Sequence, residues 1–456
     1  MRVLFLNPRF SGGTSIWISI GLLSIASFIR EHGVEVKILD NNLIEDTEAE
    51  ARKAISEFQP DIVGITGMTV QLEDALSLGK LVKEIADNTR LVYGGVHFTF
   101  KPEDGLRHGD IVVIGEGEET FYEICNGRPL AEIKGIAYND GDKIIRTEKR
   151  EPIKDLDQIP FPAYDLVNIG QYDDRFITGE KAISMMTGRG CPFDCVFCAS
   201  PQLYQRKVRY HSIDYVIEHV DYLRKNYGLE NLRIMDDTFA ASKKRVMAFC
   251  DAVTKLPYNI NMTCLTHVKT ADYEMFRRMK EAGFSMVAFG VESGSQVILE
   301  LVNKKITKDK VREAVAQSKA AGLDAELLFM IGNIGETEET IEESIQFAKE
   351  LDARYSWFQF AVPFPGSRFY ETASQYGDIL TYDTREYHHQ EPVFVPFGLT
   401  KEAMMNKRQE ALNIKADKST LEVEPESQPK ESRKSLSRKF TAPLRWLRHM
   451  LNEEAR

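Results

Sequence analysis

Hydrophobic and polar residues alternate in two rhythms along the first 125 residues. Short apolar runs typical of buried strands are separated by longer stretches in which apolar residues return every three or four positions, as in helices. The predicted strands are 3–6, 34–39, 62–66, 91–93 and 111–114, and the predicted helices are 19–31, 47–58, 72–87 and 102–107. Alternating strands and helices predict βαβ units, and therefore an α/β fold with a doubly wound, Rossmann-like parallel sheet.

The rhythm is interrupted between residues 127 and 180 and then resumes. Two apolar runs around an Asn-Asp-Gly-Asp turn predict a β-hairpin at 135–145. The prolines of 155–162 predict an extended linker. Further strands are predicted at 182–187, 231–235, 259–265, 286–290, 325–331 and 357–362, with helices at 212–227, 242–254, 271–281, 307–321 and 337–351. Six βα units favour a partial (β/α)6 barrel of the TIM type, with functional residues after the strands.

These patterns predict four parts: a Rossmann-like domain at 1–126, a hairpin and linker at 127–180, a barrel core at 181–400, and a polar linker with a basic tail at 401–456. In the tail, apolar residues that include Trp446 recur at helical spacing among arginines. Such a helix can lie on an anionic membrane or dock on its own domain. The uncharged stretch 16–29 is shorter than the roughly 20 residues of a membrane span, so we expect a buried helix there.

Composition narrows the functional classes. The chain has 456 residues, of which 43% are hydrophobic and 28% charged, as in ordinary globular proteins. A net charge of -11 argues against a general nucleic-acid binder. Three of the six cysteines, Cys125, Cys250 and Cys264, fall in apolar runs and are expected to be core residues. We expect a reducing, cytoplasmic location, with peripheral membrane contact through the tail as an open alternative.

The other three cysteines, Cys191, Cys195 and Cys198, form a C-x3-C-x2-C loop. Three thiolates can hold three irons of a [4Fe–4S] cluster and leave the fourth open, whereas an electron-transfer cluster normally takes four. A structural zinc site needs a fourth ligand, and the closest downstream histidine is His211. An odd triplet cannot pair off as disulfides, which leaves a chance group of inert cysteines as the remaining alternative.

This loop resembles that of the radical S-adenosylmethionine (radical SAM) superfamily. The resemblance implies that the three cysteines bind a catalytic [4Fe–4S] cluster whose open iron is chelated by S-adenosylmethionine. It also implies cofactor contacts at three later strand ends: the ammonium at Asp236 and Asp237, the ribose at Glu292 and Ser293, and the adenine at Gly332. The two aspartates could instead cap a helix. Ile334 replaces the usual proline of the adenine motif, a small departure because backbone groups make that contact.

The N-terminal segment resembles the cobalamin-binding domain that precedes many radical SAM cores. The similar strings are 33–40, 61–66, 93–97 and 115–120, and they imply that cobalamin contacts Thr66, Gly94, Gly95, Gly115 and Glu116. The glycines could also serve only as tight turns.

One departure concerns the cobalt ligand of such domains. Many of them carry a cobalt-ligating histidine in a D-x-H-x-x-G motif, but here residues 7–12 read Asn-Pro-Arg-Phe-Ser-Gly. An alternative interpretation, that this domain has lost the cofactor, therefore stays open. His97 lies on a plausible ligand loop, although a lone histidine there is more typical of a hydrogen-bonding loop residue.

The resemblance implies an enzyme that splits S-adenosylmethionine to a 5′-deoxyadenosyl radical. With cobalamin as second cofactor, the predicted reaction is methyl transfer to an unactivated carbon of a small-molecule, lipid or tetrapyrrole substrate, with flavodoxin or ferredoxin as electron donor. The alternatives are a radical cyclase or oxidase of the magnesium-protoporphyrin ester cyclase type, and a non-catalytic iron–sulfur or cobalamin sensor. A methylthiotransferase is disfavoured, because such enzymes carry three further N-terminal cysteines and this half has only Cys125.

Overall fold

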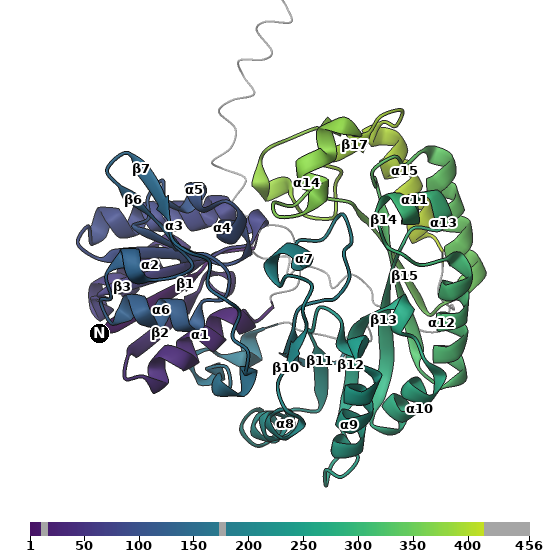
Figure 1. The fold of residues 1–456 in the computed structure, drawn as a ribbon, viewed down its shortest axis with the longest axis horizontal. Helices are drawn as coiled ribbons and strands as arrows, with labels where there is room; N and C mark the ends of the chain where they lie inside the picture. The colour runs from purple at the N-terminus through teal and green to yellow at the C-terminus, as the bar shows by residue number, and fades with distance from the viewer. Residues whose placement is uncertain (11–16, 173–178, 415–456) are drawn as a thin grey trace, which may run out of the picture. The chain divides into compact units, whose positions relative to one another are not determined.

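The computed structural model describes residues 1–10, 17–172 and 179–414 (Figure 1). Its N-terminal domain contains a seven-stranded sheet in the order β2-β1-β3-β4-β5-β6-β7. The strands are β1 (Arg2–Asn7), β2 (Glu35–Asp40), β3 (Ile62–Thr66), β4 (Arg90–Gly94), β5 (Ile111–Val113), β6 (Ile136–Asp140) and β7 (Lys143–Arg146). The helices are α1 (Ile20–Glu31), α2 (Thr47–Phe58), α3 (Leu72–Ile85), α4 (Val96–Phe100), α5 (Pro102–Gly105) and α6 (Glu118–Cys125). Strands β1 to β5 are parallel, as predicted.

Helices cover both faces of this sheet, because its central strands are apolar on both sides. Helices α1 and α6 cover one face and α2 and α3 the other (Figure 1), and their apolar side chains form a separate core on each face. The two cores confirm the doubly wound fold. Helix α1 begins at Ile20, within the uncharged stretch 16–29 for which a buried helix was predicted, and runs past it to Glu31; Leu22, Ala26 and Ile29 lie in its core face.

The predicted hairpin exists and joins this sheet. Strand β6 pairs antiparallel with β5 and β7 pairs antiparallel with β6. The N-terminal sheet therefore continues to Arg146, past the boundary predicted at residue 126. The cause is that β5 has a free edge which the next apolar segment, Ile136–Asp140, covers.

The second domain is built on a six-stranded sheet in the order β15-β14-β13-β12-β11-β8, and every pairing is parallel. Its strands are β8 (Ile183–Met185), β11 (Asn231–Ile234), β12 (Asn261–His267), β13 (Phe284–Glu292), β14 (Asp324–Ile331) and β15 (Tyr355–Phe360). Its longer helices are α8 (Ile213–Tyr227), α9 (Lys243–Val253), α10 (Tyr273–Glu281), α11 (Gln296–Leu301), α12 (Lys308–Ala320), α13 (Glu338–Leu351) and α15 (Lys401–Leu412). Shorter elements are β9 (Gly188–Arg189), α7 (Ser200–Leu203), β10 (Arg209–Tyr210), α14 (Arg368–Thr372), β16 (Gly377–Ile379) and β17 (Phe394–Pro396).

This sheet is a partial barrel, as predicted, with its helices on the outside (Figure 1). Local sequence sets the helix starts: the hydroxyls of Ser212, Thr307 and Thr337 accept hydrogen bonds from backbone N–H groups in the first turns of α8, α12 and α13. Cys250 and Cys264 are buried in α9 and β12, which confirms them as core residues, and Cys125 is buried at the end of α6.

Helix α15 packs on the core, although residues from 401 onward were predicted as linker and tail. Met404 is fully buried in the barrel core and Ala411 is nearly so. Residues 1–414 form one compact unit. The amphipathic helix predicted near Trp446 lies outside the described residues, and the other boundaries, at 180 and 456, remain predictions.

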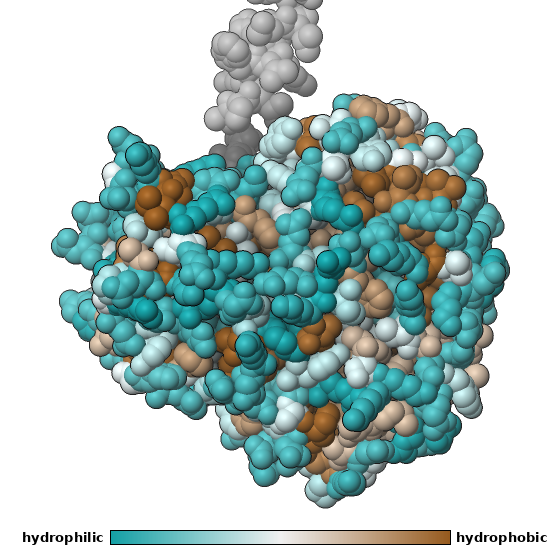
Figure 2. All heavy atoms as spheres, viewed as in Figure 1, coloured by the Kyte–Doolittle hydropathy of each residue, from teal (hydrophilic) through white to brown (hydrophobic). Residues whose placement is uncertain are grey.

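The exterior is mixed in polarity. Figure 2 shows hydrophilic side chains over most of one face, with smaller hydrophobic patches between them. Among the helices of the described residues, none is both long and apolar enough to cross a membrane.

Candidate active site

The three predicted cluster cysteines lie on one loop that leaves the first barrel strand. After β8 the chain forms the short strand β9 and reaches Cys191 two residues later. Cys195 is buried, while Cys191 and Cys198 keep partial exposure, and all six cysteines of the chain are free thiols. Burial raises the pKa of the Cys191 thiol to about 11 and that of Cys198 to about 12. Because metals bind the thiolate form, a bound cation must supply the charge that displaces these protons.

The donor set fits an iron–sulfur cube better than a single ion. Within the described residues, no three His, Cys, Asp or Glu side chains are placed to hold one metal ion. A cube spreads three thiolates over three irons, so it needs them on one loop but further apart than a tetrahedral zinc ion does. The backbone N–H of Ser200 donates to Cys198 Sγ at 3.4 Å, the kind of contact that tunes cluster sulfur.

Two carboxylates at the end of β11 tie down both ends of this loop. Asp236 accepts from the Thr187 backbone N–H and hydroxyl, each at 2.6 Å, and from the Gly188 N–H at 3.1 Å. Asp237 accepts from the Gly190 N–H at 3.0 Å and the Ser200 hydroxyl at 2.9 Å. The aspartates predicted to bind the ammonium of S-adenosylmethionine thus also shape the cysteine loop.

The two aspartates differ in access. Asp236 is 4% exposed, and burial raises its pKa to about 6. Asp237 is only partly buried. Of the pair, Asp237 is the better placed to meet a ligand, and the ammonium contact itself stays a prediction.

Glu292 occupies a strained position at the end of β13. Its φ is +72°, which is uncommon for a residue with a side chain, and the register with β14 shifts between Gly290 and Glu292. Its carboxylate pairs with Lys304 Nζ at 2.8 Å, and both side chains are at most 10% exposed. Backbone strain of this kind concentrates at functional sites, which supports the predicted ribose contact.

Lys304 is a site residue that the sequence prediction missed. The neighbouring Val302 carbonyl accepts from the Val196 N–H at 2.9 Å, and Asn303 Nδ2 donates to the Asp194 carbonyl at 2.5 Å, so this segment runs beside the cysteine loop. Burial raises the pKa of Cys195, and the charge of Lys304 opposes that shift. In sequence, Lys304 stands next to the exposed Lys305 in a polar run, so no local pattern distinguishes it.

The remaining predicted contacts lie around β13 and β14. Ser293 is fully buried, and its hydroxyl lies 3.1 Å from that of Ser344 in α13. Gly332 has φ +89° and donates its N–H to Glu336 Oε2 at 2.5 Å. Met404 of α15 covers this turn, because a Cβ on Gly332 would come within 2.6 Å of its methyl group. The structure therefore brings the predicted adenine motif under α15.

The predicted cobalamin residues meet at one edge of the N-terminal sheet, where β3, β4 and β5 end. A Cβ on Gly95, which has φ +95°, would come within 2.8 Å of Gly67 N and Thr66 Oγ1, so the first two strand ends touch through backbone. Met68 and Val96 follow these ends and are 49% and 42% exposed. Glycine backbone with exposed apolar side chains suits a large flat macrocycle.

His97 does not offer a free ring nitrogen at this edge. It is 2% exposed, and its ring nitrogens lie 3.1 Å from Thr69 Oγ1 and 3.1 Å from Asp104 Oδ2. The structure confirms the prediction that its ring is hydrogen-bonded, but His97 lies in the short helix α4 and not on a loop. Residues 11 and 12 of the string without histidine lie outside the described residues.

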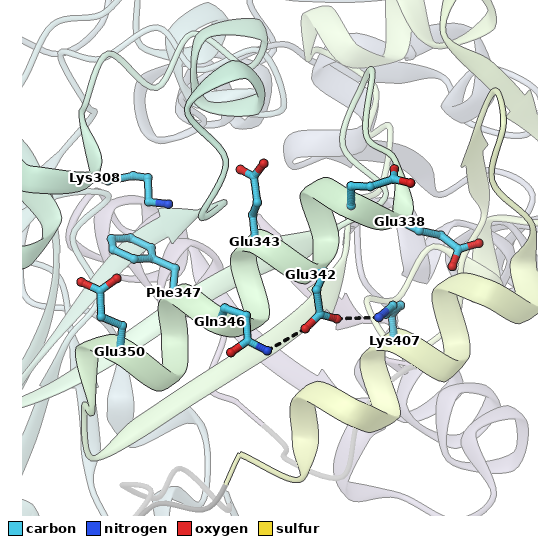
Figure 3. A pocket seen from close by; sticks show the side chains of 9 residues that line it. Lys308, Glu338, Glu342, Glu343, Gln346, Phe347, Glu350 and Lys407 are labelled. Atoms are coloured by element: carbon cyan, nitrogen blue, oxygen red, sulfur yellow. Dashed lines mark hydrogen bonds and ion pairs between the residues drawn. The ribbon is translucent and has the colours of Figure 1, made fainter.

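A groove on the outer side of α13, about 540 Å³ in volume, is separate from these residues (Figure 3). It is lined by glutamates of α13 together with Lys308 and Lys407, and Glu342 pairs with Lys407 across it. None of the predicted cofactor residues lines this groove.

A doubly wound domain with a glycine-rich strand edge, followed by a partial barrel with a three-cysteine loop, defines a two-cofactor enzyme. Comparison with family models agrees: residues 13–125 match the B12 binding domain and residues 185–348 match the radical SAM superfamily. The chain belongs to the radical SAM superfamily and carries a B12-binding domain in front of its radical SAM core. The predicted cofactors, a [4Fe–4S] cluster, S-adenosylmethionine and cobalamin, are those of this family.

Individual proteins are similar to this chain over most of its length. An uncharacterized methyltransferase of Pyrococcus horikoshii is 39% identical over 381 residues, 82% of each chain. The anaerobic magnesium-protoporphyrin IX monomethyl ester cyclase of Rubrivivax gelatinosus is 28% identical over 89% of this chain and 76% of its own. The radical S-adenosylmethionine methyltransferase TsrM of Kitasatospora setae, solved with tryptophan and an S-adenosylmethionine analogue, shares the fold at 18% identity, with TM-score 0.71 over 90% of this chain and 88% of its own.

Proposed function

We propose that this protein is a cobalamin-dependent radical SAM methyltransferase that acts on an unactivated carbon of a small molecule. The observation that carries the proposal is a direct connection between the two cofactor regions. Arg189, two residues before Cys191, forms ion pairs with Glu116 and Glu118, which follow the β5 end of the cobalamin edge. An enzyme that combines both cofactors on one substrate needs them held together in this way.

The cofactors supply the difficult chemistry: the cluster provides the electron that cleaves S-adenosylmethionine, and cobalamin provides the methyl group. The chain's own residues bind and orient. Asp237 and Glu292 are the carboxylates proposed to bind the ammonium and ribose. Lys304 places a buried positive charge beside the cluster cysteines. Gly332 leaves room for the Met404 side chain, which covers the adenine motif.

The substrate class is narrowed only by analogy. Relatives whose names include methyltransferase act on different molecules, among them cytidylyl-2-hydroxyethylphosphonate and bacteriochlorophyllide d. We propose a small molecule of lipid or tetrapyrrole type, in line with the tetrapyrroles named for several relatives.

An acidic flavodoxin or ferredoxin is the proposed electron donor. Arg206 and Arg368, which are 62% and 42% exposed, flank Asp194 within the cysteine loop at 3.9 and 3.4 Å. Lys207 and Lys305 are exposed on the same two loop segments as Arg206 and Asn303. Cations around the cluster loop of a protein with net charge -11 favour an acidic partner there.

The test is anaerobic reconstitution with iron, sulfide and hydroxocobalamin, followed by incubation with cell extract and S-adenosylmethionine labelled in its methyl group. We expect the label in a product other than S-adenosylmethionine derivatives, and we expect its formation to require cobalamin. The Cys195→Ala variant is the control and should form no labelled product.

The second candidate, a radical cyclase or oxidase, has its own signature. It is favoured by the similarity to the cyclase of Rubrivivax gelatinosus over 89% of this chain. Product formation that consumes S-adenosylmethionine without incorporating label would support it and contradict methyl transfer. A protein that binds the cofactors but does not cleave S-adenosylmethionine, with any extract, would support the sensor alternative.

A further inference from the structure

Two arginines and two glutamates form a buried ion-pair network between the two domains. Glu116 and Glu118 come from the N-terminal domain, at the end of β5 and the start of α6, and Arg189 and Arg209 come from β9 and β10 of the core. All four side chains are at most 13% exposed. We name this group the interdomain network.

The contacts are close and multiple. Arg189 Nη2 lies 2.5 Å from Glu118 Oε1, and its Nη1 lies 3.2 Å from Glu116 Oε1. Arg209 donates both of its terminal nitrogens to Glu116, at 2.6 and 3.0 Å. The Ser24 hydroxyl of α1 donates to Glu118 Oε1 at 2.9 Å. Burial disfavours the ionised form of Glu118, yet Arg189 lowers the pKa of that carboxyl below its ordinary value.

A network of this kind is a poor source of stability. Desolvating four charges costs about as much as their attraction returns, and apolar residues of equal volume hold interfaces at least as firmly. What ion pairs provide instead is a defined orientation, because a guanidinium group binds two carboxylate oxygens in only one arrangement. Arg189 and Arg209 lie opposite each other in the antiparallel β9–β10 pair. Their like charges repel, so the two glutamates are needed to neutralise them, which fixes the arrangement further.

The network also connects the two predicted cofactor regions. On one side, Glu116 follows Gly115, a predicted cobalamin contact, at the edge where β3, β4 and β5 end. On the other, Arg189 is separated from Cys191 by Gly190 alone, and Asp237 holds that glycine's N–H at 3.0 Å. A shift of either domain relative to the other must therefore break ion pairs that lie next to both predicted cofactor regions.

We propose that the interdomain network fixes the distance and orientation between the cluster and the cobalamin, with Arg189 as its central positioning residue. This inference rests on the proposed function, since it requires that both cofactors bind. Glu116 is itself a predicted cobalamin contact, whereas Arg189, Arg209 and Glu118 act only by setting where the two cofactors stand. A looser network would let that distance vary by the ångström or so that separates productive from unproductive alignment.

The test measures that distance without a substrate. Protein loaded with the cluster and cobalamin is reduced until both centres carry an unpaired electron, and pulsed electron paramagnetic resonance measures their dipolar interaction. We expect one narrow distance distribution in the wild type, and about a twofold wider or displaced one in Arg189→Met and Glu118→Gln. Arg189→Lys keeps the charge but not the fork and should give an intermediate width.

The matched control is Arg30→Met. Arg30 pairs with Asp165 of the linker at 2.6 Å, on the outside of the same domain, so its loss should leave the distribution unchanged. Iron content, cobalamin affinity and melting temperature are measured for every variant. If Arg189→Met does not fold, Glu118→Gln and Arg209→Met decide the question.

Three outcomes overturn the inference. The first is an unchanged distribution in folded, fully loaded variants. The second is equal broadening in Arg30→Met. The third is loss of cobalamin by Arg189→Met with its fold intact, because the residue would then support the cobalamin site itself. A wild type that binds no cobalamin would instead contradict the proposed function, so the two failures are distinguishable.

Discussion

At the scale of single residues, the site depends on charges that are buried together. Lys304 and Glu292 form a pair in which neither partner reaches water easily, beside thiols that become anionic when they bind iron. A buried cation near a cluster stabilises its reduced form, because reduction adds negative charge in a medium of low dielectric constant. Lys304 therefore pairs with Glu292 of the predicted S-adenosylmethionine site and also favours reduction of the cluster.

Replacing Lys304 by Met should lower the reduction potential of the cluster, on the order of 100 mV. The substitution removes the cation and leaves Glu292 as an unpaired carboxylate, and both effects disfavour added negative charge. The measurement is a redox titration followed by electron paramagnetic resonance. Lys305→Met, the exposed neighbour, should leave the potential unchanged, and equal potentials in the two variants would contradict the role assigned to Lys304.

Glu336 should make stability depend on pH. Burial raises its pKa to about 8 despite hydrogen bonds from the Gly332 and Asn333 N–H groups, and within the described residues its Oε1 has no hydrogen-bond partner. When folding raises the pKa of a carboxyl, its contribution to stability is fully present at pH values below the pKa of the unfolded chain. That contribution is lost as the pH rises towards the folded-state pKa, here about 8. Across this interval the free energy of unfolding should fall by up to about 1.4 kcal/mol per pH unit.

The check is denaturation of wild type and Glu336→Gln at several pH values between about 5 and 8. The variant should show a shallower fall in stability with rising pH. Glu339→Gln, on the exposed side of α13, is the control and should keep the wild-type slope. Identical slopes in wild type and Glu336→Gln would refute the assignment.

At the scale of elements, the end of β11 acts as the anchor of the cysteine loop. Its carboxylates hold the loop at residues 187–190 and again at Ser200, on either side of the three cysteines. A cluster loop must keep its thiolates in position before iron arrives, because each misplaced ligand raises the cost of assembly. The aspartates give that preorganisation from the neighbouring strand.

Asp236→Asn should therefore reduce iron incorporation. The amide turns one acceptor into a donor facing N–H and O–H donors, at a cost of about 1–3 kcal/mol. Iron and sulfide content after reconstitution, with the cluster absorbance, measures the effect. Asp272→Ala is the control: Asp272 caps α10 far along the chain, so its loss costs about 1 kcal/mol without changing iron content. Full iron content in Asp236→Asn would show that the loop needs no such anchor.

The sequence predicts these elements well where the signal is local. Strand and helix periodicity located both sheets, and the C-x3-C-x2-C spacing located the loop. The partners of the charged groups could not be predicted in that way. Glu116 was predicted to contact cobalamin, and that contact stays untested, but its carboxylate binds Arg209, 93 residues further along the chain. Pairs like this depend on how two domains dock, which no local pattern records.

At the scale of the whole molecule, the described core closes with α15 rather than at residue 400. Met404 of α15 fills the space above Gly332, and Lys407 pairs with Glu342 of α13. Arg408 donates to the Phe358 carbonyl at the end of the barrel sheet. The helix thus packs on β15 and α13 and covers the adenine motif at Gly332.

Two truncations test where the functional unit ends. A chain that stops after residue 414 keeps every predicted cofactor residue and α15, so we expect wild-type iron content, cobalamin affinity and S-adenosylmethionine affinity.

A chain that stops after residue 400 loses Met404 and its packing, at a cost of about 2–5 kcal/mol for that side chain alone. Exposure of the adenine motif should also weaken S-adenosylmethionine binding more than cobalamin binding, because the sheet edge at β3–β5 belongs to the other domain. Equilibrium binding of each cofactor measures both effects. Met404→Ala in the full chain separates the side chain from the helix and should show the same selective loss in smaller degree. If the chain ending at 400 binds S-adenosylmethionine like the wild type, α15 is only a cover for the fold and has no part in the site.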